Sequence, residues 1–306
     1  MTYEEKLARF NEHIEAGGKV EANDWMPDDF RRGVLKFIEM HANSEIMGAL
    51  PERECLPSAP TLQRKMSLCA KIQDEVGHAQ LLYRVAEDLG KSRVAMYEDL
   101  VTGKAKFHNV FHYPVKHWGD VAIIGWLIDG AALVTQAALL DSSYAPYTRV
   151  LKRICAEEQL HLRHGEDITL ELASGTDAQR EMFQEALNRW WLAIIHFFGP
   201  RSNVEKDLLL RWKVKTRTNE DLRNEFLDRY VPKILELGFT IPAPTPVQTA
   251  NGHWELVEEE IDWAPLDAIK RNEGPETARR LATRRSMYES HRWVREALEE
   301  PAIHAA

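Results

Sequence analysis

Two short motifs in the chain place a carboxylate and an imidazole three residues apart. Glu75-Val-Gly-His78 and Glu158-Gln-Leu-His161 both have the form ExxH. On a helix, residues i and i+3 share a face, so each motif can present two metal-binding side chains to one point. A single ExxH motif is weak evidence, because a Glu and a His recur at this spacing by chance. The stronger evidence comes from the carboxylates that precede each motif.

A carboxylate precedes each motif at almost the same distance. Glu45 lies 30 residues before Glu75, and Asp129 lies 29 residues before Glu158. The chain therefore contains a carboxylate helix followed by an ExxH helix, twice. In di-iron carboxylate proteins, two helices of a four-helix bundle each supply one carboxylate, and the other two each supply an ExxH pair. Carboxylate and imidazole ligands suit iron or manganese, so the pattern predicts a two-metal site inside a bundle.

Asp129 is the single charged residue in the apolar segment 121–140. A run of this length could span a bilayer, but no basic cluster precedes it and the chain as a whole is 28% charged. Burying an unpaired carboxylate costs several kcal/mol, so Asp129 needs a partner or a metal. We interpret the segment as a buried helix with space beside the carboxylate, left by small residues: Gly125, Gly130, Ala131 and Ala132.

Other ionisable residues lie close to the predicted ligands. Glu157 flanks the second motif and Asp74 lies off the ligand face of the first, so we expect both to stand behind the ligands or at the surface. Lys71 lies four residues before Glu75. The interpretation that we favour is an i,i+4 ion pair between these two. The alternative is a cation at the edge of the metal site.

Nearly every segment before residue 238 has a helical pattern of apolar residues, and none alternates as a strand does. We expect Pro51 to end the first long helix. Asp120 and Thr218 should cap later ones. This predicts an all-α fold, with a four-helix bundle and additional helices. The expected helices cover 2–16, 27–50, 61–89, 92–101, 121–140, 146–173, 176–198, 203–216 and 219–237.

The C-terminal part of the chain has a different composition. We expect residues 1–238 to form the helical domain with the metal site, and residues 239–306 to form a small C-terminal extension. The extension starts with a proline-containing stretch, 240–262, whose alternating run HWELVEEEIDW predicts a small hairpin. From residue 263 onward the sequence is charged and helical in pattern.

Composition excludes some classes of protein. The net charge is −9, so a nucleic-acid partner is not expected. The N-terminus, MTYEEKLARF, is charged and has no apolar signal core. The three cysteines form no CxxC pair and suit a reducing compartment. We therefore expect a cytoplasmic protein that is not embedded in a membrane.

Around these motifs the sequence resembles a known family. The stretches HANSEIMGALPE, AKIQDEVGHAQLLY, IGWLIDGAAL and RICAEEQLH, among others between about residues 24 and 298, resemble the catalytic α subunits of bacterial phenylacetyl-CoA epoxidases. The resemblance implies a ferritin-like four-helix di-iron bundle. It also implies a monooxygenase reaction of aerobic phenylacetate degradation, in which one atom of O₂ enters the aromatic ring of phenylacetyl-CoA as an epoxide and the other leaves as water.

The resemblance also implies a set of partners and roles. Electrons would come from NADPH through a separate reductase subunit, since this chain has no nucleotide-binding fingerprint. A homologous structural subunit without metal ligands and a small accessory subunit would complete the complex. Glu52 and Lys71 match family positions near the metals and are expected to be catalytic. The residues expected to hold two iron ions are Glu45, Glu75, His78, Asp129, Glu158 and His161.

The family's contacts to the CoA part of the substrate carry over to basic, aromatic and polar positions. These are Lys36, Met40, Lys106, Phe107, His108, Asn109, His196, Lys215 and Asn219. His196 departs from the family pattern, where an apolar residue is expected, and the 103–112 stretch is unusually rich in His. Three alternatives stay open: another acyl-CoA such as benzoyl-CoA, an iron-storage protein, and a metal-free scaffold subunit. The presence of all six ligands speaks against the last.

Overall fold

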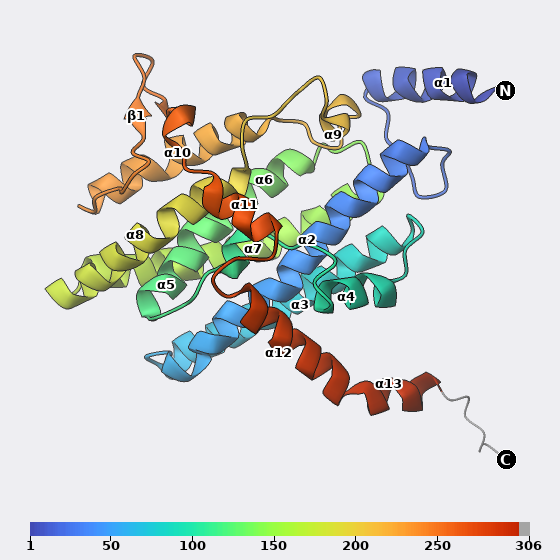
Figure 1. Ribbon diagram of the computed structural model, residues 1–306. Helices are drawn as coiled ribbons and strands as arrows, with labels where there is room; N and C mark the ends of the chain where they lie inside the picture. The colour runs from blue at the N-terminus through green and yellow to red at the C-terminus, as the bar shows by residue number, and fades with distance from the viewer. Residues whose placement is uncertain (300–306) are drawn as a thin grey trace.

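The computed structural model describes residues 1–299; residues 300–306, the end of the predicted extension, lie outside the described part. The predicted all-α fold is confirmed, and its centre is a four-helix bundle in which the fourth member is built from three consecutive segments (Figure 1). The bundle members are α2 (Asp28–Cys55), α3 (Leu62–Glu87), α7 (Ala145–Ala173), and the run of α5 (Trp118–Ile123), η3 (Ile124–Ile128) and α6 (Asp129–Leu139).

Apolar side chains at helical spacing hold the first two members together. On α2, Phe30, Val34 and Ile38 recur every four residues and are completely buried. They pack in one cluster with Leu82 and Ala86 of α3. Burying each large apolar side chain contributes about 1.5–3 kcal/mol. This end of the bundle is therefore an apolar core, and the predicted metal ligands of these helices lie further along them.

The prediction that Pro51 ends α2 was wrong. The helix continues to Cys55 with Pro51 inside it. A proline removes one backbone hydrogen bond, but Pro51 and Glu52 are both buried here, and packing outweighs that loss. Because Glu52 follows Glu45 by seven residues, about two turns, the continued helix keeps both carboxylates on one face.

The predicted role of Asp120 as a helix N-cap was also wrong. The apolar helix starts at Trp118, and His117 is its N-cap. Asp120 is the third helical residue, and its side chain accepts hydrogen bonds from the backbone of Lys116 and His117. One segment of the described chain, Trp118–Leu139, is long and apolar enough to cross a membrane, with mean hydropathy 1.6, but 78% of its apolar window is buried in the protein.

A π-helical turn interrupts this apolar helix directly before Asp129. Such turns insert one residue into a helix and recur at functional sites. Within this turn, the backbone of Gly125 packs against that of Gly165 in α7. The approach is so close that a Cβ on Gly165 would lie 2.0 Å from the Gly125 carbonyl carbon. The small residues near Asp129 thus serve different purposes. Gly125 admits a neighbouring helix, and Ala132 lines the cavity described below.

Further helices surround the bundle. α8 packs on α5 and α7, α10 packs on α6 and α8, and α4 packs on α3. Thr176 and Thr218 cap α8 and α10 as predicted, both with capping boxes. The predicted helix over 203–216 is reduced to a single short turn, α9. These helices are α1 (Tyr3–Glu15), α4 (Arg93–Val101), α8 (Asp177–Phe198), α9 (Leu208–Arg211) and α10 (Asn219–Glu236).

The last part of the described chain contains the predicted hairpin and the predicted charged helices. The hairpin pairs only β1 (Val247–Gln248) with β2 (Trp254–Glu255), because the rest of the alternating run leaves the ladder and forms a 3-10 turn. Buried Arg280 ties α12 to the segment between α4 and α5 through the backbone carbonyls of Phe111 and Tyr113. The helices are α11 (Ala264–Lys270), α12 (Thr277–Ser290) and α13 (Arg292–Glu299), seen at the centre and lower right of Figure 1.

Candidate metal centre

The six residues predicted to bind metal come together in the middle of the bundle. Their donor atoms form two groups, each with all atoms within 4.8 Å of one another. Glu158 belongs to both groups, so the two groups share its carboxylate. All six side chains are buried. The first group is Glu45, Glu75, His78 and Glu158, and the second is Asp129, Glu158 and His161.

Both imidazoles present Nδ1 to the cluster and Nε2 to its outside. His78 Nδ1 lies 3.3 Å from Glu158 Oε1, while its Nε2 lies 2.8 Å from Glu157 Oε2. His161 Nδ1 lies 3.2 Å from Glu158 Oε2, while its Nε2 lies 3.1 Å from Asp74 Oδ2. A carboxylate on the outer nitrogen fixes the tautomer of a metal-binding histidine and raises its basicity. Glu157 and Asp74 contact the outer nitrogens of His78 and His161 in this way.

Lys71 is buried at the other end of the cluster. Its Nζ lies 2.6 Å from Glu52 Oε1 and 2.5 Å from Asp129 Oδ2. The ion pair with Glu75 that we favoured from the i,i+4 spacing is therefore wrong, because Lys71 reaches across to two carboxylates on other helices. A cation thus lies at the edge of the site. Glu52 Oε2 is buried and lacks a hydrogen-bond partner among the described residues.

The concentration of buried charge shifts the ionisation of these groups. Burial, with repulsion from Glu158 and Glu45, raises the pKa of Glu75 well above its ordinary value. Burial also raises the pKa of Glu52 to about 7, against the attraction of Lys71. Burial disfavours the charged form of His78, but hydrogen bonds to Glu158 and Glu45 outweigh this effect and raise its pKa to about 10. Protons on Glu75 and His78 therefore offset part of the buried negative charge.

A count of formal charges fits two divalent metal ions. Five carboxylates converge here, counting Glu52 with the four predicted ligands, and Lys71 supplies one ammonium. Metal binding displaces protons from its ligands; with all five carboxylates ionised and both imidazoles neutral, four negative charges are left over, which equals the charge of two Fe(II) ions. Nδ1 of His78, 3.3 Å from Glu158 Oε1 and 3.5 Å from Glu45 Oε2, is directed at the same place. The residues present therefore fit a pair of iron or manganese ions.

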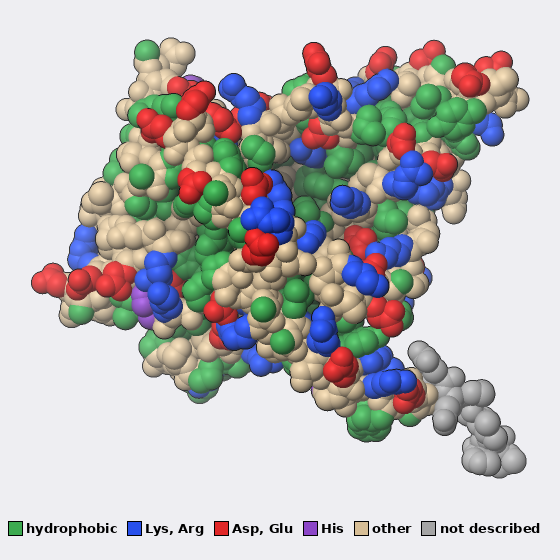
Figure 2. Space-filling view, in the orientation of Figure 1, with side chains coloured by type: hydrophobic (Ala, Val, Ile, Leu, Met, Phe, Trp, Pro, Cys, Tyr) green, Lys and Arg blue, Asp and Glu red, His purple; other side chains and the backbone are tan. Residues whose placement is uncertain are grey.

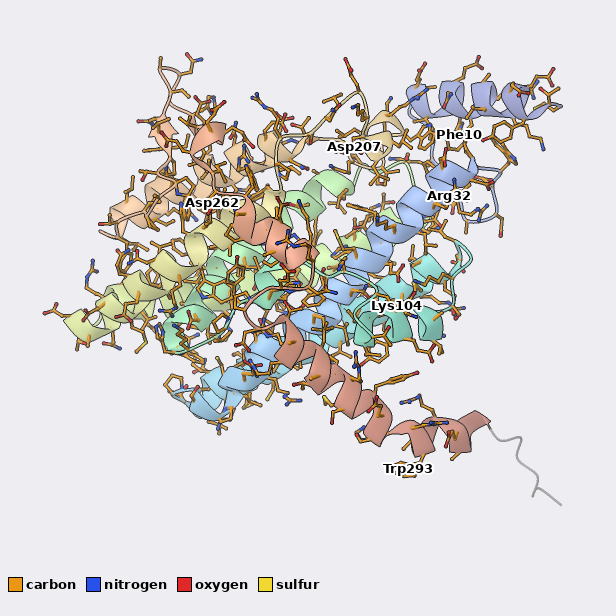
Figure 3. The ribbon with its side chains drawn as sticks, viewed as in Figure 1. Phe10, Arg32, Lys104, Asp207, Asp262 and Trp293 are labelled. Carbon is orange, nitrogen blue, oxygen red and sulfur yellow. The ribbon has the colours of Figure 1, made fainter. Side chains whose placement is uncertain are left out.

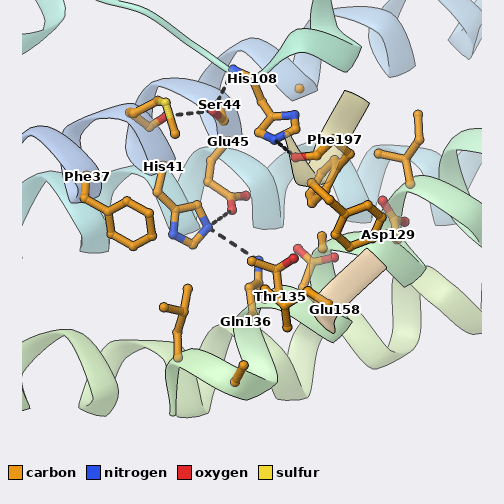
Figure 4. A pocket seen from close by; sticks show the side chains of 18 of the residues that line it. Phe37, His41, Ser44, Glu45, His108, Asp129, Thr135, Gln136, Glu158 and Phe197 are labelled. Atoms are coloured by element: carbon orange, nitrogen blue, oxygen red, sulfur yellow. Dashed lines mark hydrogen bonds and ion pairs between the residues drawn. The ribbon is translucent and has the colours of Figure 1, made fainter. Parts of the chain in front are cut away.

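A hydrogen-bonded chain behind Glu45 was not anticipated from the sequence. His41 Nε2 lies 2.8 Å from Glu45 Oε1 (Figure 4). Its Nδ1 lies 2.7 Å from the hydroxyl of completely buried Tyr147. Although burial opposes it, hydrogen bonding to His41 and His78 holds the pKa of Glu45 well below its ordinary range. The spacing of His41 and Glu45, four residues apart on one helix, was the available signal.

A largely apolar cavity opens directly onto the carboxylates. Its volume is about 290 Å³, at the lower limit of the roughly 300–1,000 Å³ typical of small-molecule sites. Its lining includes all four predicted carboxylate ligands and Glu52, but neither His78 nor His161. The carboxylate side of the cluster thus faces the cavity, and the imidazole side faces away. Apolar walls come from Phe37, Phe111, Ile124, Ile128, Leu139, Phe197 and Phe198.

His108 forms part of the cavity wall. Its ring lies 3.9 Å from the ring of Phe197, between centroids, and its Nε2 lies 3.1 Å from the Phe197 carbonyl oxygen. Its backbone N–H donates to Ser44 Oγ. Burial lowers the pKa of His108 to about 3, so the ring is neutral. A neutral ring suits a wall against an apolar ligand.

Polar residues gather at the outer end of the cavity. Lys215, Arg217 and Asn219 line it there, and Lys215 Nζ lies 3.0 Å from Asp207 Oδ2 and 3.1 Å from Asn219 Oδ1. Asp207 lies at the start of α9 (Figure 3). Figure 2 shows this face hollowed in its upper middle, with hydrophobic side chains inside the hollow and Lys and Arg at its edge.

The nine positions predicted to contact CoA fall into two sets. Met40, His108, Lys215 and Asn219 line the cavity, and Lys36 is exposed one turn before Met40 on α2. The other four lie elsewhere and hold the fold together. Lys106 bonds to Asn272, Phe107 stacks on His112, Asn109 donates to the Ala193 carbonyl, and His196 stacks on Trp263.

Comparison with known proteins gives two findings. A family model described as "Phenylacetic acid catabolic protein" matches residues 3–293. The chain is also 42% identical over 300 residues to a curated protein of Escherichia coli (strain K12), which is named as one of the subunits of 1,2-phenylacetyl-CoA epoxidase. The match covers 97% of this chain and 96% of that protein.

Proposed function

Because the chain belongs to the phenylacetic acid catabolic protein family, we propose that it is the catalytic subunit of a multicomponent di-iron epoxidase whose substrate is phenylacetyl-CoA. The observation that carries the proposal is the convergence of six buried metal-binding side chains at the inner end of an apolar cavity. The Escherichia coli relative is named as one subunit of its epoxidase, which supports a complex of several chains.

Two iron ions would occupy the two donor groups. Glu45, Glu75 and His78 would hold one, Asp129 and His161 the other, with Glu158 between them. Bound there and reduced, the iron pair would supply the electrons and open coordination positions that the activation of O₂ requires. The protein's part is to fix the ligands. Glu157 and Asp74 orient the two imidazoles, and His41 orients Glu45.

The cavity would hold the phenylacetyl group with its ring toward the carboxylates. About 290 Å³ accommodates an aromatic acyl group and not a nucleotide. The aromatic and aliphatic walls exclude water from the reacting carbon atoms. The CoA part would extend past Lys215, Arg217 and Asn219, whose positive charges and amide suit its phosphates.

The overall reaction balances as a monooxygenation. One atom of O₂ forms the epoxide across a ring double bond, and the other leaves as water with two protons. The two electrons come from NADPH, which becomes NADP⁺. Since the chain contains no nucleotide-binding fingerprint, another protein must carry these electrons to it.

The test is turnover of defined thioesters by the purified complex with iron, O₂, NADPH and an electron-transfer protein. We expect consumption of one NADPH for each phenylacetyl-CoA epoxidised, with one ¹⁸O atom from ¹⁸O₂ in the product by mass spectrometry. Benzoyl-CoA, which lacks the methylene between ring and carbonyl, serves as the comparison substrate. Faster epoxidation of benzoyl-CoA would assign the alternative substrate. Failure of both thioesters, with iron bound, would refute the proposal.

A further inference from the structure

The two sides of the candidate metal centre reach different faces of the protein. The carboxylates open to the substrate cavity, whereas the outer nitrogens of the two imidazoles point the other way. On that other side lies a second hollow, between α3, α4, α7 and the C-terminal helices. Asp74 and Glu157 line it, and within the described chain it shares no lining residue with the substrate cavity.

Only one side chain separates each imidazole from the surface at this hollow. Glu157 bonds to His78 and is 28% exposed, and Asp74 bonds to His161 and is 34% exposed. The imidazoles themselves are almost completely buried. Electron transfer through protein weakens steeply with distance, so a donor seated here is separated from both predicted metal positions by a carboxylate and an imidazole.

The helix that borders the hollow has an unusual outer face. Its exposed residues between 62 and 80, all within the described chain, carry no charge, although 28% of the whole chain is charged. Charged side chains normally cover exposed helix faces, and depletion of charge marks the core of protein interfaces. These exposed residues are Leu62, Gln63, Met66, Cys69, Ala70, Gln73, Val76, Gly77 and Gln80.

Positive charge is in slight excess at the same hollow. Its lining has three arginines, Arg93, Arg153 and Arg295, against two carboxylates, which the imidazoles engage. Arg153 also pairs with Glu157, and Arg93 lies 3.0 Å from Glu87 outside the lining. The chain has a net charge of −9, so a cluster of arginines is a local exception. It would attract an acidic protein surface and speed its association.

We propose that this face, formed by the outer side of α3 and the hollow beside it, is the docking surface for the acidic electron-carrier protein that reduces the metal centre. The proposal rests on the proposed function, because epoxidation with O₂ requires two electrons from outside this chain. Each turnover delivers two electrons through this face, and NADPH loses both. Since substrate enters from the opposite side, the donor docks while the thioester is bound.

The experiment reverses charge at the docking face without touching the metal centre. The variant combines Gln80→Glu and Arg93→Glu, both of which line the hollow. The matched control is Arg229→Glu on α10, a helix that packs on α6, α8 and β2. The native protein and each variant are assembled into their complexes. The affinity of each iron-stripped complex for the NADPH-dependent reductase is measured by biolayer interferometry. KM for the reductase is measured with the iron-loaded form.

We expect the double variant to bind the reductase at least tenfold more weakly and to show a KM for it at least tenfold higher. The control should match the native protein. Single turnover of phenylacetyl-CoA with chemically reduced iron should be unchanged in all three. For the native complex, added salt should weaken reductase binding, because it screens the charges.

Unchanged reductase affinity in the double variant would overturn the docking proposal. So would loss of the other subunits from the complex by size-exclusion chromatography, because the face would then belong to a structural partner. Failure of the chemically reduced native complex to form epoxide would count against the proposed function instead, while its reductase affinity would still test the docking face.

Discussion

Replacing Lys71 by Met tests the ionic structure of the candidate metal centre. The substitution keeps a long unbranched side chain and removes the ammonium that lies 2.6 Å from Glu52 and 2.5 Å from Asp129. Breaking a buried ion pair by removing one partner costs about 3–5 kcal/mol, because the other charge is left uncompensated. We expect Lys71→Met to lower the free energy of unfolding of the iron-stripped protein by this amount. At about 2 °C per kcal/mol for a chain of this size, Tm falls by about 6–10 °C.

Iron should reverse much of this loss. Two Fe(II) ions bring positive charge back beside Asp129, so the Tm difference between variant and native protein should shrink to less than half when both are loaded anaerobically. Differential scanning calorimetry with and without iron measures this. Lys270→Met is the control, because the ion pair of Lys270 with Asp267 is exposed to solvent and contributes little to stability.

Two results would refute the reasoning. If Lys71→Met leaves the stability of the iron-stripped protein unchanged, the two short ion pairs contribute nothing and the charge count is irrelevant. If the Tm difference is the same with and without iron, the metal does not lie beside Asp129, and the second donor group is misassigned.

Three further tests, which use four substitutions, address other parts of the structure. Glu158→Ala removes the carboxylate shared by both donor groups, so iron by colorimetric assay should fall from about two to at most one per chain; two irons retained would contradict the ligand set. Gly165→Ala places a Cβ against the Gly125 backbone and should lower Tm. Gly77→Ala is the control, because a Cβ there has nothing within 4 Å, and it should stabilise α3 by up to about 1 kcal/mol. Equal effects on Tm would contradict the close approach of Gly165 to Gly125. Lys215→Ala should raise the Kd for phenylacetyl-CoA at least fivefold by calorimetry while iron stays bound, and an unchanged Kd would place the CoA elsewhere.

The metal-binding pattern could be predicted because it depends on local spacing. Each ExxH motif needs only one helical turn, and the preceding carboxylates repeat at nearly one distance, so the sequence alone pairs Glu75 and Glu158 with Glu45 and Asp129. The contacts of Lys71 could not be predicted. Its partners lie on other helices, and the choice among nearby carboxylates depends on packing.

Other features depend on tertiary contacts that leave little trace in one sequence. A proline usually ends a helix, but the burial of Pro51 within α2 overrides this local rule. The π-helical turn before Asp129 has no composition that distinguishes it from the α-helix on either side. Phe107 and His196, which the family resemblance assigns to CoA contacts, stack on His112 and Trp263 inside the fold, and their contact with CoA stays a prediction.

The arrangement of the four bundle helices explains why the centre has two separate approaches. Each ExxH helix presents its Glu and His to the same cluster, so the outer imidazole nitrogens must point past the bundle, where Glu157 and Asp74 receive them. The carboxylate helices carry the opposite wall, and the cavity forms there between Gly48 and Ala132. On our proposal, an apolar substrate would therefore approach the carboxylates, and an electron carrier on the other face would approach the imidazoles through Glu157 and Asp74. Because the two approaches share no lining residue within the described chain, we expect saturating thioester to leave the KM for the electron carrier unchanged.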